Sequence, residues 1–392
     1  MRVLQVYDLA PNDQEPTEGV GLAIWQLSKA LAEMGHEVWL LGGSGPITRQ
    51  LTRVGKVAIR RVDRLGLMRR TWSPTGLKFT RQLFFPPIVL SRRELVTELS
   101  GFDVVHGHIY SGGLAGLLLG RRLGLPVFNT IHGSYYEVWN QIVGSRLAPF
   151  VRFAEKKSVL YLARAVDCQI HADRSFADMV RGWGVNPEKL CVIHNGVADE
   201  LIRLYDEPNG STIPTYVTAR RLVRKNGLDF LLKAFALLLK RQNARLRIAG
   251  EGPEYQHLLN LAALLGIRDS VEFSGVIPHS NIPEFIRGGE VAVLPSIAEA
   301  SSLFLLECMA LGRPVVCSFV GGIKEVVDEE TAWLVQPGDP VRLAEAMLHA
   351  VQHWDESLAK VRKAHARTLE RHAWGKVAEK TLKCYNSCGA EN

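Results

Sequence analysis

Short apolar runs alternate with longer amphipathic stretches along the first half of the chain. The shorter runs are rich in Val, Ile and Leu, as buried strands are, and the stretches between them are long enough for helices. In order they read VLQVY, LAIWQLSKALAEMG, VWLLGG, VVHGH, LAGLLLGRRLG, VFNTIHG, CQIHA and CVIHNGV. Strands separated by helices of this length predict parallel sheets built from βαβ units, and hence the α/β class.

The alternation stops once, in the polar segment ADELIRLYDEPNGSTIP that follows Val197. It restarts with TYVTA, LDFLLKAFALLLKR, LRIAG, VEFSG, VAVLPS and VVCS. A break rich in turn formers predicts a linker near residues 199–213 between two doubly wound, Rossmann-like domains. We place these domains at residues 1–200 and 201–373, each long enough to bury its own core.

Polar residues gather where the predicted strands end. VVHGH ends in His106 and His108, VFNTIHG in His132, and RIAGEGP in Gly250 and Gly252. Ligands of doubly wound sheets bind at the carboxyl ends of the strands. We therefore expect a site in a cleft between the two domains. The glycines either let backbone approach a ligand there or make a tight strand-to-helix turn.

Two loops are suited to anions. The turn EGVG, Glu18 to Gly21, precedes a helix whose free N–H groups can meet an anion, although it can also be only a tight turn. It lacks the third glycine and the acidic residue of the dinucleotide fingerprint, which disfavours NAD. The turn RRLVRKN holds a cluster of cations suited to a diphosphate, or else a solvated basic turn: Arg220, Arg221, Arg224 and Lys225.

Two carboxylates stand eight positions apart in EASSLFLLECMALGRPVV. Ser301 or Ser302 can cap a helix that begins near Leu303, which leaves Glu299 in the loop and puts Glu307 on the second turn. Glu307 lies among apolar residues and needs a partner from outside its helix. A helix start that can hold phosphate, flanked by carboxylates that accept sugar hydroxyls, suits a sugar nucleotide. The alternative is a partly exposed glutamate in a packed helix.

Charge is concentrated in one segment. The formal net charge is +7, and residues 53–93 hold eleven Lys or Arg against one acid, Asp63. The same segment contains Trp72, Phe79, Phe84 and Phe85. Basic and aromatic residues together suit an anionic bilayer and a lipid-linked acceptor, and a solvated loop is the alternative. Nucleic acid is disfavoured because no nucleic-acid-binding fold accompanies the charge.

The chain has no sequence feature of a membrane-spanning or metal-binding protein. Its apolar runs are too short to cross a bilayer, and MRVLQVYDL reads as a strand rather than a signal peptide. We expect a cytoplasmic protein that can also sit peripherally at the inner face of the cell membrane. The six cysteines show no C-x-x-C spacing, although Cys384 and Cys388 are one helical turn apart, and no D-x-D pair occurs. We expect no metal and no cofactor.

Taken together, these motifs resemble the retaining glycosyltransferases of the GT-B fold that carry an E-x7-E motif, the family-4-like or group 1 glycosyl transferases. The resemblance runs in the family's order through EGVG, VVHGH, TIHG, VIHNGV, RRLVRKNG, AGEGP, VEFSGVIP, VAVLPS, the Glu299 and Glu307 pair and AWGKVAEKTLKCY. It implies a nucleoside-diphosphate sugar donor, linked to UDP, GDP or ADP, and transfer to a hydroxyl of a glycan or a lipid-linked acceptor. It also implies that residues 374–392 form a helix that crosses back to the first domain.

The resemblance further implies roles for individual residues. Glu307 would bind the ribose, Glu299 the transferred sugar, Arg221 the diphosphate, and His132 the donor sugar from the first domain. The remaining donor-side residues implied are Gly19, Gly21, Lys225, Asn226, Gly250, Gly252, Val276, Ile277, Ser301, Ser302 and Leu303. The acceptor-side residues are Glu18, His106 and His108.

Three positions depart from the family's pattern. The lysine of R-L-x-x-x-K-G is Asn226 here, with Lys225 beside it, so either can serve the diphosphate. The segment that begins at Glu299 reads E-A-S-S, whereas the family often has E-x-F-G there. Glu18 places an acid in the first glycine loop. These departures leave open a catalytically idle sugar-nucleotide-binding scaffold, or an epimerase or hydrolase of the donor.

Overall fold

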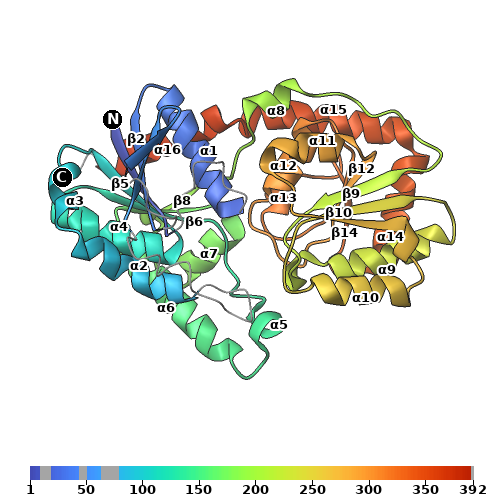
Figure 1. Cartoon of the computed structure of the whole chain (residues 1–392), viewed down its shortest axis with the longest axis horizontal. Helices are drawn as coiled ribbons and strands as arrows, with labels where there is room; N and C mark the ends of the chain where they lie inside the picture. The colour runs from blue at the N-terminus through green and yellow to red at the C-terminus, as the bar shows by residue number, and fades with distance from the viewer. Residues whose placement is uncertain (9–18, 44–50, 63–78, 390–392) are drawn as a thin grey trace. The chain divides into compact units, whose positions relative to one another are not determined.

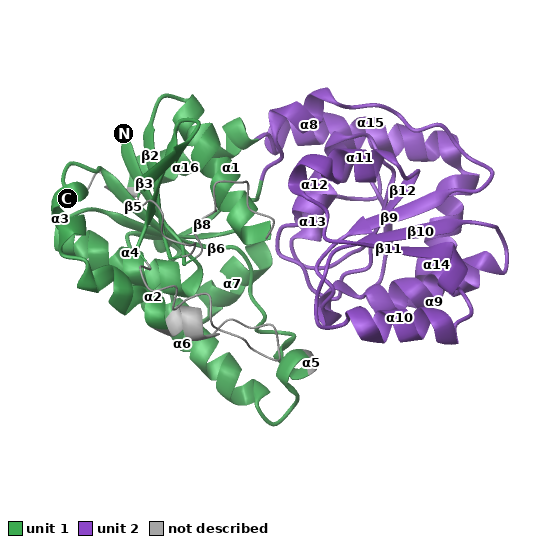
Figure 2. Cartoon of the chain, in the orientation of Figure 1, with its two compact units in different colours: residues 1–195, 374–392 green, residues 196–373 purple. Residues whose placement is uncertain are grey.

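The computed structural model describes residues 1–8, 19–43, 51–62 and 79–389. Glu18, Trp72 and the rest of the basic segment over 63–78 therefore lie outside the described residues. The chain forms two compact units (Figure 2), one of residues 1–195 with 374–392 and the other of residues 196–373. Each unit is a parallel α/β domain, as the sequence pattern predicts.

The first unit is built on an eight-stranded sheet with the order β3-β4-β2-β1-β5-β6-β7-β8. All neighbouring strands are parallel except the pair β3 and β4. The strands are β1 (Arg2–Val6), β2 (Glu37–Gly42), β3 (Leu51–Val54), β4 (Val57–Arg61), β5 (Val104–His108), β6 (Val127–Ile131), β7 (Cys168–His171) and β8 (Leu190–Val192).

Helices cover both faces of this sheet (Figure 1). The described helices are α1 (Gly19–Glu33), α2 (Phe79–Ser91), α3 (Glu94–Glu98), α4 (Ile109–Leu123), α5 (Trp139–Val143), α6 (Ala148–Ala165), α7 (Arg174–Gly182) and α16 (Trp374–Gly389). Apolar residues of α2, α3, α4 and α6 share one core cluster with β1 and β5. Helix α16 contacts α1 and brings Tyr385 to β5, so the C-terminal helix belongs to the first unit.

The second unit is built on a six-stranded parallel sheet with the order β11-β10-β9-β12-β13-β14. Its strands are β9 (Thr215–Ala219), β10 (Arg245–Ala249), β11 (Val271–Gly275), β12 (Val291–Leu294), β13 (Val315–Ser318) and β14 (Trp333–Val335). Its helices are α8 (Asp199–Arg203), α9 (Leu228–Leu239), α10 (Tyr255–Leu264), α11 (Ile282–Arg287), α12 (Leu303–Ala310), α13 (Ile323–Val326), α14 (Pro340–Gln352) and α15 (Trp354–Arg371).

Alternating residues of the central strands divide the core of this unit in two. On β12, Val291 and Val293 pack with α9, α10 and α14, whereas Ala292 and Leu294 pack with α11, α12 and α15. Successive side chains of a strand point to opposite faces, so a strand that is apolar throughout serves both layers. Figure 1 shows the two groups of helices on opposite faces of the sheet.

Two element boundaries differ from the sequence-based expectation. Residues 199–203, expected in the linker, form the short helix α8, whose Leu201 and Ile202 are buried against the second unit. Burial of these apolar side chains stabilises the folded chain, whereas a solvated linker would leave them exposed to water. In addition, Gly19 and Gly21 belong to the first turn of α1 rather than to a loop before it.

Candidate functional site

The turns that follow β9 and β10 pack directly on one another. Arg220 N–H donates to Ala249 O at 2.9 Å, and Leu222 N–H donates to Glu251 O at 2.8 Å. A Cβ on Gly250 would collide with the carbonyl of Arg220, and one on Gly252 with the carbonyl of Leu222. Another stretch of backbone therefore occupies the space where a side chain would lie, so both glycines are needed for this close packing.

Glu299 lies in a ring of positive and polar groups at these strand ends. Arg220 pairs with it through Nη2, and Lys225 Nζ lies 3.9 Å from Oε1. Ser296 Oγ donates to it at 3.5 Å. Burial alone would raise the pKa of Glu299, but the charges of Lys225 and Arg220 outweigh burial and hold that pKa below its usual range. Glu299 is therefore ionised at neutral pH.

The arginine that meets Glu299 is Arg220 rather than Arg221. The Arg220 side chain is only 6% exposed and also donates to Ser296 Oγ and, at 3.3 Å, to Asn226 Oδ1. Arg221 is exposed, and its carbonyl accepts from Asn226 Nδ2 at 2.6 Å. Asn226, which stands in the family's lysine position, is thus buried and bound to the turn itself.

Helix α12 begins at Leu303, as its sequence predicts. Ser302 is the N-cap, and its Oγ accepts from Leu305 N–H at 3.2 Å; Ser301 is buried beside it. Glu307 falls on the second turn and is 7% exposed. Its partner comes from another element, because His279 Nε2 lies 2.8 Å from Glu307 Oε1.

Two further residues that the family resemblance assigns to the donor, Val276 and Ile277, lie on the segment between β11 and α11. Val276 is half exposed immediately after β11, and Ile277 packs against the core cluster that includes α12. His279 opens a short 3-10 turn, His279–Asn281, before α11. Val276, Ile277 and the partner of Glu307 therefore share one loop.

In the first unit, three predicted histidines lie together at the ends of β5 and β6. The rings of His106 and His108 stack with centroids 4.3 Å apart, and those of His108 and His132 with centroids 5.2 Å apart. His106 is held by Tyr385 Oη and Thr130 Oγ1, each at 2.6 Å. Burial lowers the pKa of His106 to about 3 and that of His132 to about 4, and it lowers the pKa of His108 as well.

The hydrogen bonds of this group fix which nitrogen of His132 can accept. Gln5 Oε1 can only accept, so His108 Nε2 donates to it. A neutral His108 then carries no proton on Nδ1, which accepts from His132 Nε2 at 3.0 Å. Within the part of the chain that the structure describes, the buried His132 Nδ1 has no hydrogen-bond partner. That atom is an acceptor.

The backbone is strained beside these histidines, at the end of β5. Ile109, the residue after His108 and the first of α4, has φ of +58°. A β-branched residue in the left-handed region costs on the order of 1–2 kcal/mol. Asn129 Nδ2 donates to Ile109 O at 2.9 Å and holds the turn in this conformation. Strained residues that the surrounding structure holds in place occur mainly at functional sites.

In each unit, several residues that contact the predicted site residues carry weak signals in the sequence. His279 binds Glu307 from 28 positions away, and Gln5 and Tyr385 hold histidines of β5 from opposite ends of the chain. Gly321 has φ of +44°, and its Cβ would collide with the carbonyl of Glu299. Only the Gly321-Gly322 pair, a common turn signal, could have been read in advance.

The basic segment is not a uniform cationic surface over its described part, residues 53–62 and 79–93. Arg60 is buried and pairs with Glu98 at 2.8 Å, and Arg61 is buried with Nη1 donating to Thr52 Oγ1 at 2.8 Å. Phe85 is fully buried, whereas Phe84 is half exposed. The expectation of a membrane surface is therefore wrong for Arg60, Arg61 and Phe85, whose burial is part of the fold.

Known proteins resemble this chain over nearly its whole length. The model of the family described as Glycosyltransferase Family 4 matches residues 17–201, and that of Glycosyl transferases group 1 matches residues 213–353. The D-inositol 3-phosphate glycosyltransferase of Acidothermus cellulolyticus is 31% identical, over 76% of this chain and 70% of that protein. A phosphatidylinositol N-acetylglucosaminyltransferase polypeptide from Arabidopsis thaliana is 27% identical, over 100% of this chain and 87% of that protein.

Solved structures share the fold. Sucrose-phosphate synthase from Thermosynechococcus elongatus superposes with a TM-score of 0.83 at 20% identity, over 100% of both chains. Anabaena HepE in complex with UDP-glucose superposes with a TM-score of 0.75 at 17% identity, over 99% of this chain and 100% of that one. Both likenesses are to GT-B architecture, with its two parallel α/β domains. From these matches in sequence and fold we conclude that the chain belongs to the family 4, or group 1, glycosyltransferases and is a transferase enzyme.

Proposed function

We propose that this enzyme transfers a sugar from a nucleoside-diphosphate sugar to an acceptor hydroxyl with retention of anomeric configuration. The observation that carries the proposal is the pair of carboxylates on either side of the capped start of α12, Glu299, whose side chain is 12% exposed, and Glu307, which is buried. HepE, a structural neighbour, has been solved with UDP-glucose, which supports a donor of this class.

The second unit would hold the donor. Glu307, with His279 beside it, would accept hydrogen bonds from the two ribose hydroxyls, and the backbone at Ser302 and Leu303 would face a phosphate. Arg220 and Lys225 place positive charge next to Glu299, which suits the diphosphate that leaves. Lys225 and Arg220 also hold the pKa of Glu299 below its usual range, so an ionised Glu299 would accept hydrogen bonds from the sugar hydroxyls.

The first unit would complete the site in our proposal. His132 Nδ1 is an acceptor and suits a hydroxyl of the donor sugar. In the transfer step the bond from the anomeric carbon to the diphosphate breaks, and the bond to the acceptor oxygen forms on the same face. The acceptor proton goes to the departing diphosphate, so the protein needs only to position the reactants and stabilise the charge.

The first experiment is a thermal melt of the purified chain with UDP, GDP, ADP and their sugar conjugates. A ligand at a hundredfold its Kd stabilises the folded state by roughly 2.7 kcal/mol. We expect one base to raise Tm and Glu307→Ala to lose the shift. Glu325→Ala, an exchange of another glutamate of the same unit, is the matched control and should keep it.

The outcomes separate the alternatives. Donor binding without transfer to any acceptor would favour the idle scaffold. Without an acceptor, release of the donor's sugar would favour the hydrolase, and a change in that sugar's configuration would favour the epimerase. If no nucleotide shifts the melt of a well-folded sample, the proposed donor site is contradicted.

We further propose that the acceptor is lipid-linked and that the protein works peripherally at the cytoplasmic face of a membrane through α6. This helix exposes Phe150 by 76% and Phe153 by 64%. Residues 146–164 also contain five Lys or Arg and one acid, Glu155, which is buried and accepts from Tyr110 at 2.7 Å. Exposed aromatic side chains among cations suit an anionic bilayer surface. Among the described residues, no helix is both long and apolar enough to cross a bilayer.

Sedimentation with lipid vesicles tests the membrane proposal. We expect the chain to bind vesicles that contain phosphatidylglycerol, to bind phosphatidylcholine vesicles less, and to be released by salt. Phe150→Ser combined with Phe153→Ser should abolish binding, whereas Leu264→Ser, at a residue that is 84% exposed on α10, should not. Undiminished binding of the double variant would remove α6 from the proposal.

A further inference from the structure

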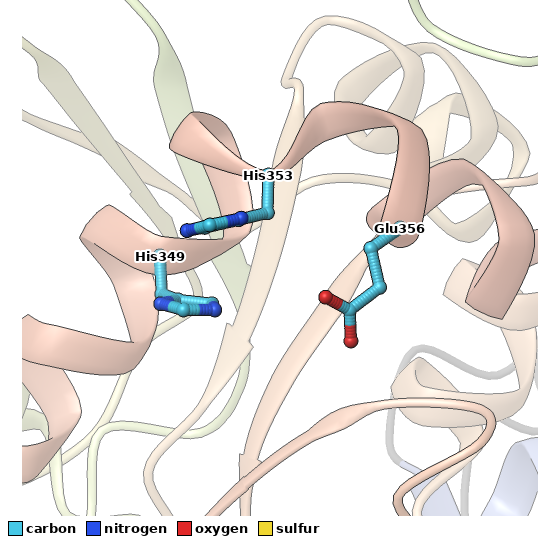
Figure 3. A group of neighbouring side chains, drawn as sticks. All are labelled: His349, His353 and Glu356. Carbon is cyan, nitrogen blue, oxygen red and sulfur yellow. The ribbon is translucent and has the colours of Figure 1, made fainter.

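A group of metal-ligand side chains lies at the junction of α14 and α15, away from the residues discussed so far. His349, His353 and Glu356 each offer a ligand atom, and these atoms all lie within 4.8 Å of one another. Figure 3 shows the two imidazole rings side by side and the Glu356 carboxylate pointing toward them. All three residues are exposed, so an ion from solution can reach them.

The local sequence explains why the three meet. His349 and His353 are four positions apart at the end of α14, a spacing that puts both side chains on one helix face. Their rings stack with centroids 3.9 Å apart. His353 N–H donates to His349 O at 2.9 Å, and the chain then turns at His353 (φ −107°, ψ 59°) into α15, whose first turn carries Glu356.

We propose that this group binds one divalent transition-metal ion, with zinc as the first candidate. Two imidazoles and a carboxylate are a donor set that zinc, nickel and copper favour, whereas magnesium and calcium prefer oxygen ligands alone. Zinc bonds to such ligands are about 2.0–2.2 Å long, and exposed side chains can reach that geometry by changing rotamer. Three protein ligands leave a further coordination position open to water.

Neighbouring side chains hold two of the ligands. Trp333 packs edge-on against His349, with centroids 4.7 Å apart, and Lys360 Nζ lies 3.3 Å from Glu356 Oε1. Lys360 Nζ also lies 4.5 Å from the centroid of the Trp333 ring. The lysine orients the carboxylate, and a bound ion would take over its role as the positive partner of Glu356.

The position in the fold separates this group from the donor residues. Helix α14 follows β14 and runs back antiparallel to the strands, so it ends at the amino-terminal edge of the sheet. Trp354, the first residue of α15, lies beside Gly210, which precedes β9. Glu299 and Arg220 lie at the opposite, carboxyl-terminal edge. The ion would therefore fix the α14–α15 junction and take no part in sugar transfer, and the inference does not depend on the proposed donor.

Calorimetric titration of the full chain with ZnCl2 tests the inference. The sample should carry no polyhistidine tag, and its thiols should be kept reduced with a phosphine. We expect saturable binding of one zinc ion per chain and no heat with MgCl2. His353→Gln and Glu356→Gln should each weaken zinc binding by about tenfold or more, which is the scale of effect for groups that support a metal site. His257→Gln, at an exposed histidine of α10, is the matched control and should leave it unchanged.

Electron paramagnetic resonance of the chain loaded with Cu²⁺ gives an independent count of ligands. We expect hyperfine coupling to two imidazole nitrogens in the native chain and to one in His349→Gln. Circular dichroism checks that the variants are folded. Equal zinc affinity in the native chain and in all three site variants would overturn the proposal. So would zinc binding that survives in these variants but disappears when the thiols are alkylated, because the cysteines would then be the ligands.

Discussion

The side chain of Arg220 links three residues around the turn after β9, since it donates to Ser296 and Asn226 and pairs with Glu299. From the sequence alone, the four cations of this turn were candidates to hold a diphosphate, and the family resemblance pointed to Arg221. The structure separates them by burial, because Arg220 is 6% exposed and Arg224 is 65% exposed.

Arg220→Gln should therefore disturb both stability and donor binding. Loss of one member of a buried ion pair costs about 3–5 kcal/mol, because the other charge stays buried without a partner. With Arg220 gone, the pKa of Glu299 should rise, so donor affinity should fall with acid at a higher pH than in the native chain. Denaturant melts and binding titrations against pH measure these effects.

Arg224→Gln is the control for that change. Arg224 belongs to the same turn, but its pair with Glu254, at 3.5 Å, is exposed, and such pairs contribute about 0–1 kcal/mol. If the two variants behave alike, Arg220 has no special role in orienting Glu299.

Gly321 offers a second test at the scale of one residue. Gly321→Ala would bring a Cβ against the carbonyl of Glu299 at φ of +44°, whereas Gly266→Ala at φ of +69° meets no heavy atom within 4 Å. The left-handed conformation alone costs an alanine about 1–2 kcal/mol. We expect Gly266→Ala to lower the free energy of unfolding by that amount. Gly321→Ala should lower it further and should weaken donor binding as well. Equal losses in denaturant melts would show that the carbonyl of Glu299 moves aside freely.

At the scale of elements, the ends of β5, β6 and β7 form a layer of neutral histidines. Burial lowers the pKa of His106 to about 3 and of His132 and His171 to about 4. The titratable groups near His106 are His108, His132 and Tyr385, and none of these is a carboxylate that could stabilise a charged imidazole. The stability of the first unit therefore depends on these histidines remaining neutral.

Acid should accordingly destabilise the first unit. An unfolded histidine takes up a proton below about pH 6.5, and these folded ones do not until about pH 4 or lower. Between those values the unfolded state binds more protons, so stability falls as the pH falls, by up to about 1.4 kcal/mol per pH unit for each histidine.

Hydrogen exchange with mass spectrometry, corrected for the intrinsic rate, measures this effect strand by strand. Peptides of β5 and β6 should lose protection between pH 6.5 and 5. Peptides of β9 and β12 are the internal control, because His106, His132 and His171 all belong to the first unit. A parallel loss in both units would assign the effect to other groups.

At the scale of the whole molecule, the proposed site draws on residues of two separate units. His132 belongs to the first unit, and Glu299 and Glu307 belong to the second. Catalysis that needs both requires the units to close over the donor. We expect small-angle scattering to report a smaller radius of gyration with the donor nucleotide than without it. Superimposable profiles at saturating nucleotide would contradict closure.

The sequence by itself determined what depends on neighbouring residues. Alternating apolar runs specified two parallel α/β domains, and a serine before an apolar run, Ser301 or Ser302, specified that α12 begins near Leu303. Both follow from hydrogen bonds and burial within a few residues. Residues 199–203 were misread as linker because their burial depends on a distant surface, the core beside α12.

Only the tertiary structure decided which side chains meet. Arg220, and not Arg221, pairs with Glu299, and His279 contacts Glu307. Position 250 must be glycine because a Cβ there would collide with the carbonyl of Arg220. Each of these contacts joins two loops or helix ends, and its geometry is set by how strands and helices pack. The sequence specifies the helices and strands, but the distance between the ends of two such elements is set only when the sheet forms.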